Sequence, residues 1–206
     1  MDPHLKAMLE QLAAAAEGVE VPPLAVIPPP MVRAQYQEQR IATNQGAPKD
    51  VVTKDLQIDG AAGKIPARLY TPAGAAATTP LLVYFHGGGF VVGDLESHDA
   101  ACRLICRDAG VHVLSVDYRL APEHKAPAAF DDGYAAYTWA REHAEELGAD
   151  PTRIAVGGDS AGGNLATVVA RRARDAGDPL PVLQWLIYPV TDWRGQSRSR
   201  TLFADG

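Results

Sequence analysis

The central part of the chain alternates short apolar runs with longer stretches of helical periodicity. Four runs are almost continuously apolar: Leu81–Phe85, Val111–Val116, Ile154–Val156 and Leu183–Tyr188. Strands without polar alternation are typical of a parallel sheet that is covered on both faces. Helices are predicted between them, at Ser97–Asp108, Pro127–Leu147 and Ala161–Asp175. This order predicts an α/β fold with a mostly parallel sheet flanked by helices.

The first part of the chain has a different pattern. Apolar residues recur at helical spacing from Leu5 to Ala16, and a second helix is predicted around Met31–Ile41. The intervening segment Val21–Pro30 carries five prolines, which predicts a stiff extended connector. A hairpin is predicted from two alternating runs, Val51–Ile58 and Lys64–Tyr70. We therefore divide the chain into an N-terminal segment, residues 1–45, and a core, residues 46–206.

Charge, apolar stretches and cysteine spacing limit the partners, the location and the metal or redox sites that the chain could have. The chain has 19 basic and 25 acidic residues and a net charge of -6, which disfavours a nucleic-acid or anionic-membrane partner. No stretch approaches the roughly 18 to 20 apolar residues of a membrane span, and no secretory signal is visible. Cys102 and Cys106 match neither a redox pair nor a zinc site. We expect buried free thiols, no metal and a cytoplasmic location.

The segment around Ser160 runs from a predicted strand through glycines into a predicted helix. Gly158 and Gly162 leave room for a sharp turn that exposes the hydroxyl of Ser160. The free amides of the helix start face the same place, so the Ala161 amide is a candidate donor to an oxyanion. A purely structural turn or a phosphate-binding loop would also need glycines. The phosphate alternative is weak, because the loop has neither a Gly-Lys-Ser/Thr ending nor a basic residue.

A second glycine-rich segment, His86-Gly87-Gly88-Gly89, directly follows an apolar run. Three successive glycines after a core strand indicate a close approach of the backbone to another group. We expect the amides of Gly88 and Gly89 to complete an oxyanion hole, and His86 to brace the loop by hydrogen bonding. Taken alone, the segment could be an ordinary turn. Its specificity comes from its combination with the serine segment.

These two segments resemble the bacterial hormone-sensitive-lipase-like carboxylesterases of the α/β-hydrolase superfamily, as does the stretch Asp117–His124 between them. The similarity covers roughly Leu56 to Asp192. It implies an α/β-hydrolase fold, a catalytic Ser160, an N-terminal helical cap formed by residues 1–45, short- to medium-chain ester substrates and no cofactor. It also implies an oxyanion hole made by Gly88, Gly89 and Ala161, and a supporting role in the two motifs for His86, Gly87, Gly158, Asp159 and Gly162.

The partners of the serine are not evident in the sequence. In this fold the acid and the histidine of the triad follow the serine, yet all six histidines precede Ser160. Only 18 residues follow Tyr188, whereas each further strand-helix-strand unit needs roughly 30. We therefore expect the last strands and the triad acid and histidine to be absent, and a missing C-terminal segment or a second chain to complete the sheet and the triad. This chain alone should be inactive, and the alternative is a non-catalytic small-molecule-binding protein on the same fold.

Overall fold

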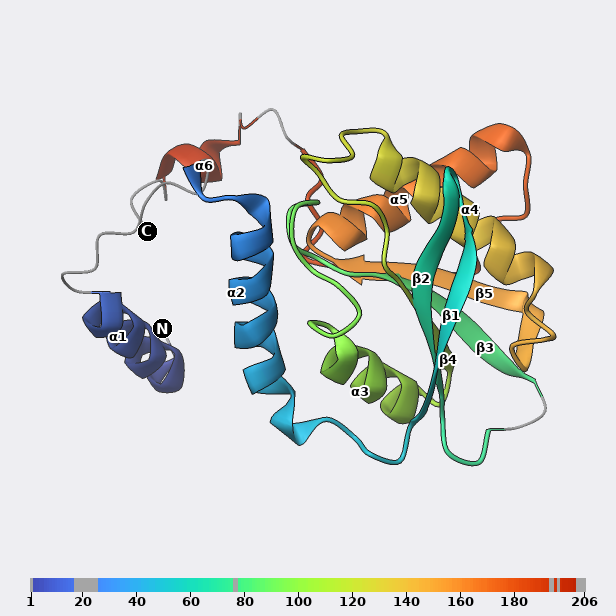
Figure 1. The fold of residues 1–206 in the computed structure, drawn as a ribbon, viewed down its shortest axis with the longest axis horizontal. Helices are drawn as coiled ribbons and strands as arrows, with labels where there is room; N and C mark the ends of the chain where they lie inside the picture. The colour runs from blue at the N-terminus through green and yellow to red at the C-terminus, as the bar shows by residue number, and fades with distance from the viewer. Residues whose placement is uncertain (1, 17–25, 76–77, 193–194, 196, 203–206) are drawn as a thin grey trace.

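The computed structural model describes residues 2–16, 26–75, 78–192, 195 and 197–202 (Figure 1). Two helices and a short 3-10 turn come first: α1 (Pro3–Ala16), α2 (Pro29–Thr43) and η2 (Asn44–Gly46). Six strands follow: β1 (Val52–Gly60), β2 (Gly63–Thr71), β3 (Thr79–Phe85), β4 (His112–Val116), β5 (Ala149–Asp159) and β6 (Gln184–Ile187). The remaining helices are α3 (Asp99–Ala109), α4 (Ala128–Glu142), α5 (Ala161–Ala176) and α6 (Arg198–Leu202).

The six strands form one sheet in the order β1-β2-β4-β3-β5-β6. The β1–β2 hairpin is antiparallel, as predicted, and β2 also pairs antiparallel with β4. The pairs β3–β4, β3–β5 and β5–β6 are parallel. The predicted α/β fold with a mostly parallel sheet is therefore confirmed.

Each face of the sheet carries its own apolar core, because successive side chains of a strand point to opposite faces. Leu81, Val83 and Phe85 of β3 belong to the core under α4 and α5. Leu82 and Tyr84 belong to the opposite core, which contains Cys102 and Cys106 of α3. Figure 1 shows α3 on one side of the sheet and α4 and α5 on the other. Both cysteines are free and buried, as expected.

Three predicted elements differ in detail from the structure. Pro29 and Pro30 are the first residues of α2 and not part of the connector, since proline tolerates the first helical turn; residues 17–25 lie outside the described part. Helix α4 ends at Glu142, before the expected stop at Leu147. The β6 run is not buried on both faces, and the Trp185 side chain is 40% exposed.

The N-terminal helix α1 leaves its apolar side chains Leu5, Met8 and Leu9 largely exposed. Figure 1 shows α1 apart from the sheet, whereas α2 runs beside the loops that follow β3. Within the described residues, no helix is both long enough and apolar enough to cross a bilayer.

Candidate active site

The carboxyl ends of β3 and β5 lie side by side at the middle of the sheet. Phe85, the last residue of β3, pairs in register with Gly158 near the end of β5. The chain leaves β3 toward α3 on one face, and leaves β5 toward α5 on the other. Such a reversal opens a crevice at the carboxyl ends of two neighbouring strands, where α/β proteins bind ligands. The glycine-rich loop and the serine turn therefore leave the sheet at this one point.

Ser160 forms the junction between β5 and α5. Its backbone has φ 53° and ψ -114°, a conformation that residues other than glycine rarely adopt. The Ser160 amide donates to the Ile187 carbonyl at 2.9 Å, and Asn164 and Val190 donate to the Ser160 carbonyl. The backbone is thus held on both sides. The hydroxyl makes no capping hydrogen bond to α5 and is therefore not used by the helix.

The glycines that flank Ser160 are required by packing against β3. A Cβ at Gly162 would overlap the Phe85 carbonyl oxygen, and a Cβ at Gly158 would overlap the same oxygen. The Gly162 position also approaches the His86 carbonyl oxygen, where a Cβ would lie at 2.7 Å. The serine turn and the start of the glycine-rich loop are therefore in direct contact.

The glycine-rich loop turns sharply directly after His86. Gly88 and Gly89 have positive φ values of 122° and 61°, and a Cβ at Gly88 would overlap the Val92 carbonyl. The Gly88 carbonyl accepts from the amides of Val91 and Val92, both at 3.0 Å, which closes the turn. Within the described part of the chain, the amides of Gly88, Gly89 and Ala161 donate to no other residue. Three main-chain donors are thus available in the two turns that touch here.

Asp159 ties the serine turn to the glycine-rich loop. Its Oδ1 accepts from the Gly87 amide at 2.9 Å and from the Tyr84 hydroxyl at 2.8 Å. His98 Nε2 lies 3.5 Å from the same oxygen. Burial alone would raise the pKa of Asp159, but His98, the Tyr84 hydroxyl and the Gly87 amide lower it to about 2. The carboxylate is therefore ionised at neutral pH and acts as an anchor.

His86 is hydrogen bonded within the glycine-rich loop. Its buried ring bonds through Nδ1 to the Gly87 carbonyl at 2.8 Å and stacks on Tyr118 at 4.4 Å between ring centres. The Tyr118 hydroxyl donates to the His86 carbonyl at 2.7 Å. Burial, with a smaller contribution from His98, lowers the pKa of His86 to about 4. The imidazole is therefore neutral at pH 7, with the Nδ1 proton facing Gly87.

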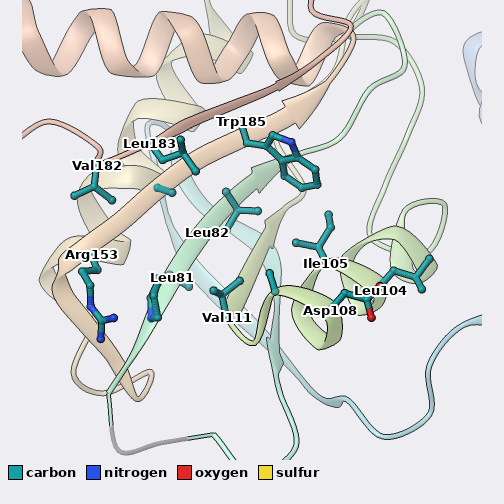
Figure 2. A pocket seen from close by; sticks show the side chains of 13 residues that line it. Leu81, Leu82, Leu104, Ile105, Asp108, Val111, Arg153, Val182, Leu183 and Trp185 are labelled. Carbon is teal, nitrogen blue, oxygen red and sulfur yellow. The ribbon is translucent and has the colours of Figure 1, made fainter.

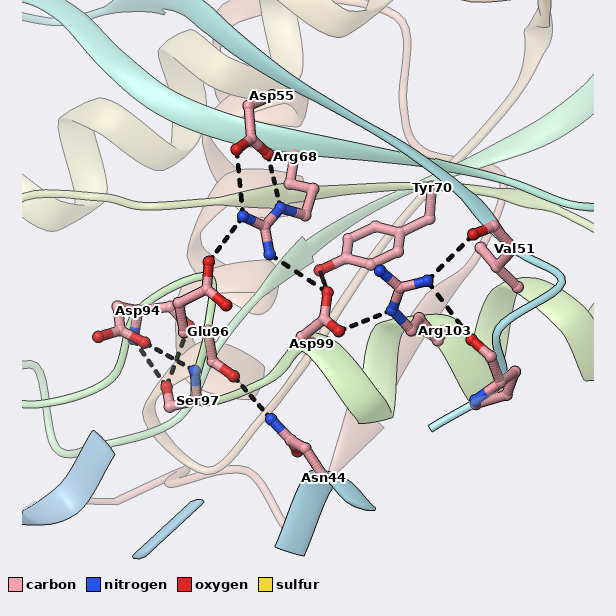
Figure 3. A network of polar contacts seen from close by, with 11 residues as sticks. Asn44, Val51, Asp55, Arg68, Tyr70, Asp94, Glu96, Ser97, Asp99 and Arg103 are labelled. Carbon is pink, nitrogen blue, oxygen red and sulfur yellow. Dashed lines mark hydrogen bonds and ion pairs between the residues drawn. The ribbon is translucent and has the colours of Figure 1, made fainter. Parts of the chain in front are cut away.

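A polar network positions the start of α3 and with it His98 (Figure 3). Arg68 of β2 binds Asp55, Glu96 and Asp99 at 2.6 to 3.2 Å. Asp94 and Ser97 close a turn through reciprocal hydrogen bonds, which leads into His98 as the residue before α3. The network therefore holds the start of α3, where His98 lies 3.5 Å from Asp159.

Two of the cavities near these elements differ in character. One, of about 340 Å³, is lined by Gly89, Phe90, Ala121, Phe130 and neighbouring residues, and so opens beside the glycine-rich loop. The larger one, of about 780 Å³, is apolar and does not include Ser160. Figure 2 shows it between α3 and the strands, with Leu82, Ile105, Leu183 and Trp185 pointing into it. No group of three or more His, Cys, Asp or Glu side chains in the described residues could hold a metal ion.

The structure brings the two predicted motifs together but also contains contributors that the sequence did not indicate. Gly93 has φ 99°, and a Cβ there would overlap the His86 ring. Arg33 of α2 donates to main-chain carbonyls next to the glycine-rich loop. Neither has a local signal, because the partners of Arg33 lie far away in the sequence and the contact of Gly93 depends on the path of the loop. The Tyr118 hydroxyl lies in the Asp117–His124 stretch that carried part of the family resemblance.

Comparison with known proteins agrees with this geometry. A family model described as alpha/beta hydrolase fold matches residues 82–206. The carboxylic ester hydrolase LipN of Mycobacterium tuberculosis is 63% identical over 157 residues, which cover 74% of this chain and 42% of LipN. The ethyl acetate hydrolase of Pseudomonas putida is 41% identical over 201 residues, with 93% of this chain and 62% of that protein covered.

Among solved structures, the ester hydrolase EH1AB1 from the metagenome of Lake Arreo has a TM-score of 0.93 and 42% identity. The match covers 100% of this chain and 65% of that one. This chain therefore spans 42% to 62% of the two curated relatives named above. The family match, the shared fold and the two motifs together show that the chain belongs to the α/β-hydrolase fold family, in its hormone-sensitive-lipase-like branch.

Proposed function

We propose that the protein is a serine carboxylic ester hydrolase that acts on short- to medium-chain esters. The observation that carries the proposal is the Ser160 hydroxyl, which makes no capping bond to α5 at a strained junction. The two turns in contact there carry three main-chain amides that donate to no residue in the described part of the chain. Relatives named as ester hydrolases support the reaction class. The complex of EH1AB1 with a phosphonate derivative supports it further, because a tetrahedral phosphorus resembles the intermediate of ester hydrolysis.

In the proposed mechanism, the Ser160 oxygen attacks the ester carbonyl carbon while a histidine base takes the hydroxyl proton. The carbonyl oxygen becomes an anion, to which the amides of Gly88, Gly89 and Ala161 donate. The C–O bond to the alcohol breaks, and the histidine returns its proton to the departing alcohol. Water then attacks the acyl-enzyme by the same route and releases the acid. No cofactor enters the scheme.

The amides suit an oxyanion for two reasons. They are main-chain donors held by rigid turns, so they need no reorganisation when charge develops, and each such donor is worth roughly two to three powers of ten in rate. The Ala161 amide also lies at the N-terminus of the 16-residue helix α5, whose dipole favours negative charge. We propose that α2, within the segment 1–45, acts as part of a cap over this site.

The histidine and the acid of the triad come, in our proposal, from a further segment or from a second chain. His86 and His98 are buried, and their nearest polar contacts involve the Gly87 carbonyl, Ser97 and Asp159. Trp185 of β6 is exposed at the edge of the sheet. We refer to the 206 residues together with that further segment or chain as the completed protein. The cytoplasmic location expected from the sequence stays a prediction.

Hydrolysis of p-nitrophenyl acetate and butyrate tests the proposal. The completed protein should turn over both esters, and Ser160→Ala should abolish this. The 206-residue chain alone should be slower by roughly six powers of ten, the loss typical of a missing triad histidine. Rapid turnover by the short chain, or turnover by Ser160→Ala, would contradict the mechanism. Saturable binding of the esters without turnover by the completed protein would instead support the non-catalytic alternative.

A further inference from the structure

Arg33 links α2 to the loop that carries two of the proposed oxyanion donors. Its Nε donates to the Val91 carbonyl at 2.8 Å and its Nη2 to the Ala121 carbonyl at 2.9 Å. Both Nη atoms also bind the Glu123 carboxylate, at 3.0 and 2.6 Å. One guanidinium from the N-terminal segment thus holds two main-chain carbonyls and one carboxylate of the core.

The two carbonyls belong to the residues that shape the end of the glycine-rich loop. The Val91 amide donates to the Gly88 carbonyl at 3.0 Å, and the Ala121 amide donates to the Phe90 carbonyl at 2.8 Å. Arg33 therefore holds the carbonyls of Val91 and Ala121, the two residues whose own amides bind the Gly88 and Phe90 carbonyls. A displacement of either segment would be passed on to the Gly88 and Gly89 amides through a single turn.

The side chain needed for this task is an arginine. Three different acceptors lie in different directions around one planar group, and a guanidinium has five N–H donors in a fixed fork. Arg33 is 29% exposed and Glu123 46%, so their ion pair is partly screened by water. The two carbonyl contacts are part-buried and tie together residues far apart in the sequence. These two carbonyl contacts are therefore the ones through which Arg33 holds the loop.

We propose that Arg33 is a positioning residue for the oxyanion hole: by holding the Val91 and Ala121 carbonyls, it fixes the Gly88 and Gly89 amides and makes their geometry depend on the docking of α2. This inference rests on the proposed function. It adds that the N-terminal segment contributes to the rate of the chemical step and does more than cover the substrate.

Hydrogen exchange measures the structural part without reference to activity. In the 206-residue chain, Arg33→Met should raise the exchange rates of the Val91 and Ala121 amides about 10-fold, because both residues lose the contact that holds their carbonyls. Arg33→Lys should give an intermediate rate, since one ammonium cannot hold both carbonyls. Glu38→Gln, at an exposed position of the same helix α2, is the control and should leave both rates unchanged. Unchanged rates in Arg33→Met, with the amides of β3 equally protected in all variants, would overturn the inference.

Kinetics of the completed protein measure the functional part. Arg33→Met should lower kcat for p-nitrophenyl acetate about 10- to 100-fold with little change in KM, because misplaced amides weaken transition-state binding. Glu38→Gln should keep the parent kcat. An equal kcat in Arg33→Met and its parent, in a protein that Ser160→Ala inactivates, would overturn the role of Arg33 alone. Retained activity in Ser160→Ala would overturn the proposed function, whatever the result for Arg33.

Discussion

At the scale of single residues, the site combines a serine in a strained backbone conformation with two flanking positions where only glycine fits. Ser160 has a positive φ, and the Phe85 carbonyl excludes a side chain at Gly158 and Gly162. The strain persists because the Ser160 amide and carbonyl are both hydrogen bonded. A hydroxyl held in this way is presented to the crevice without being used for folding. Strain of this kind is common where function and stability compete.

The strain at Ser160 can be measured by substitution. We expect Ser160→Gly to be more stable than Ser160→Ala by about 1 kcal/mol, because glycine adopts this backbone conformation without steric cost. Urea unfolding of the two variants checks this, with Gly46→Ala as a control at an exposed glycine that lacks nearby atoms. A Ser160→Ala variant that equals or exceeds Ser160→Gly in stability would show that the junction is not strained.

His86 makes stability depend on pH. Its pKa in the folded protein is about 4, below the value near 6.5 expected when unfolded. Between these values the unfolded chain binds the proton and the folded one does not, so stability falls as the pH drops from about 6.5 to 4, by up to about 3 kcal/mol. Asp159, with a folded pKa of about 2, stabilises the fold above pH 4 and loses this contribution only as the pH falls from about 4 to 2. Urea midpoints of the parent and His86→Asn between pH 5 and 7 test this; equal slopes in the two proteins would contradict it.

At the scale of elements, the β1–β2 hairpin is joined to α3 by charged side chains. Arg68 has an exposed fraction of 13% and binds Asp55, Glu96 and Asp99 (Figure 3). Asp99 also binds Arg103 and accepts from the Tyr70 hydroxyl. Because the network leads through Ser97 to His98, it connects the hairpin to the anchor of the serine turn.

Removing Arg68 should be costly. We expect Arg68→Met to destabilise the chain by about 1 to 2 kcal/mol, because the largely buried Asp99 loses one of its two arginine partners. Asp55 and Glu96 are at least half exposed, so their ion pairs with Arg68 add little. Lys64→Gln is the matched control on the same strand: its ion pair with Asp59 is more than half exposed on both sides, so we expect a loss below about 0.5 kcal/mol. Chemical denaturation of both variants measures the difference. Similar losses in the two would refute the structural role of the network.

The sequence predicted the elements of this site better than the contacts between them. The apolar runs predicted β3 and β5, and the glycine spacing predicted the turns at Ser160 and Gly88, because these signals are local. Arg33 and Gly93 were not predicted, since their partners lie far away in the chain or depend on the exact path of the loop. The end of α4 was placed too late, because Gly148 ends a later turn and not the helix.

At the scale of the whole molecule, the sheet ends in an apolar edge. Strand β6 pairs with β5, and Leu183 and Trp185 face the cavity of about 780 Å³ beside α3 (Figure 2). Leu183 is 59% exposed and Trp185 is 40% exposed. An exposed edge strand next to an apolar surface favours association with another segment or chain. This is the surface that we expect the completed protein to cover.

The apolar edge gives a prediction for the chain by itself. We expect it to associate as its concentration rises, and Trp185→Glu to shift the equilibrium toward the monomer. Val52→Glu provides a control at the other edge of the sheet, where Val52 is 65% exposed on β1. Sedimentation velocity over a concentration series measures this. A parent chain that stays monomeric throughout, or equal effects of the two substitutions, would count against a role for this surface.

The central claim is that Ser160 is an activated nucleophile, and covalent labelling tests it most directly. The activated serine oxygen attacks the phosphorus of a fluorophosphonate, an O–P bond forms, the P–F bond breaks and fluoride leaves, so the adduct marks the nucleophile. In the completed protein we predict one adduct, found by mass spectrometry on the peptide that contains Ser160 and absent from Ser160→Ala. A completed protein that stays unlabelled, or an adduct that persists in Ser160→Ala, would contradict the claim.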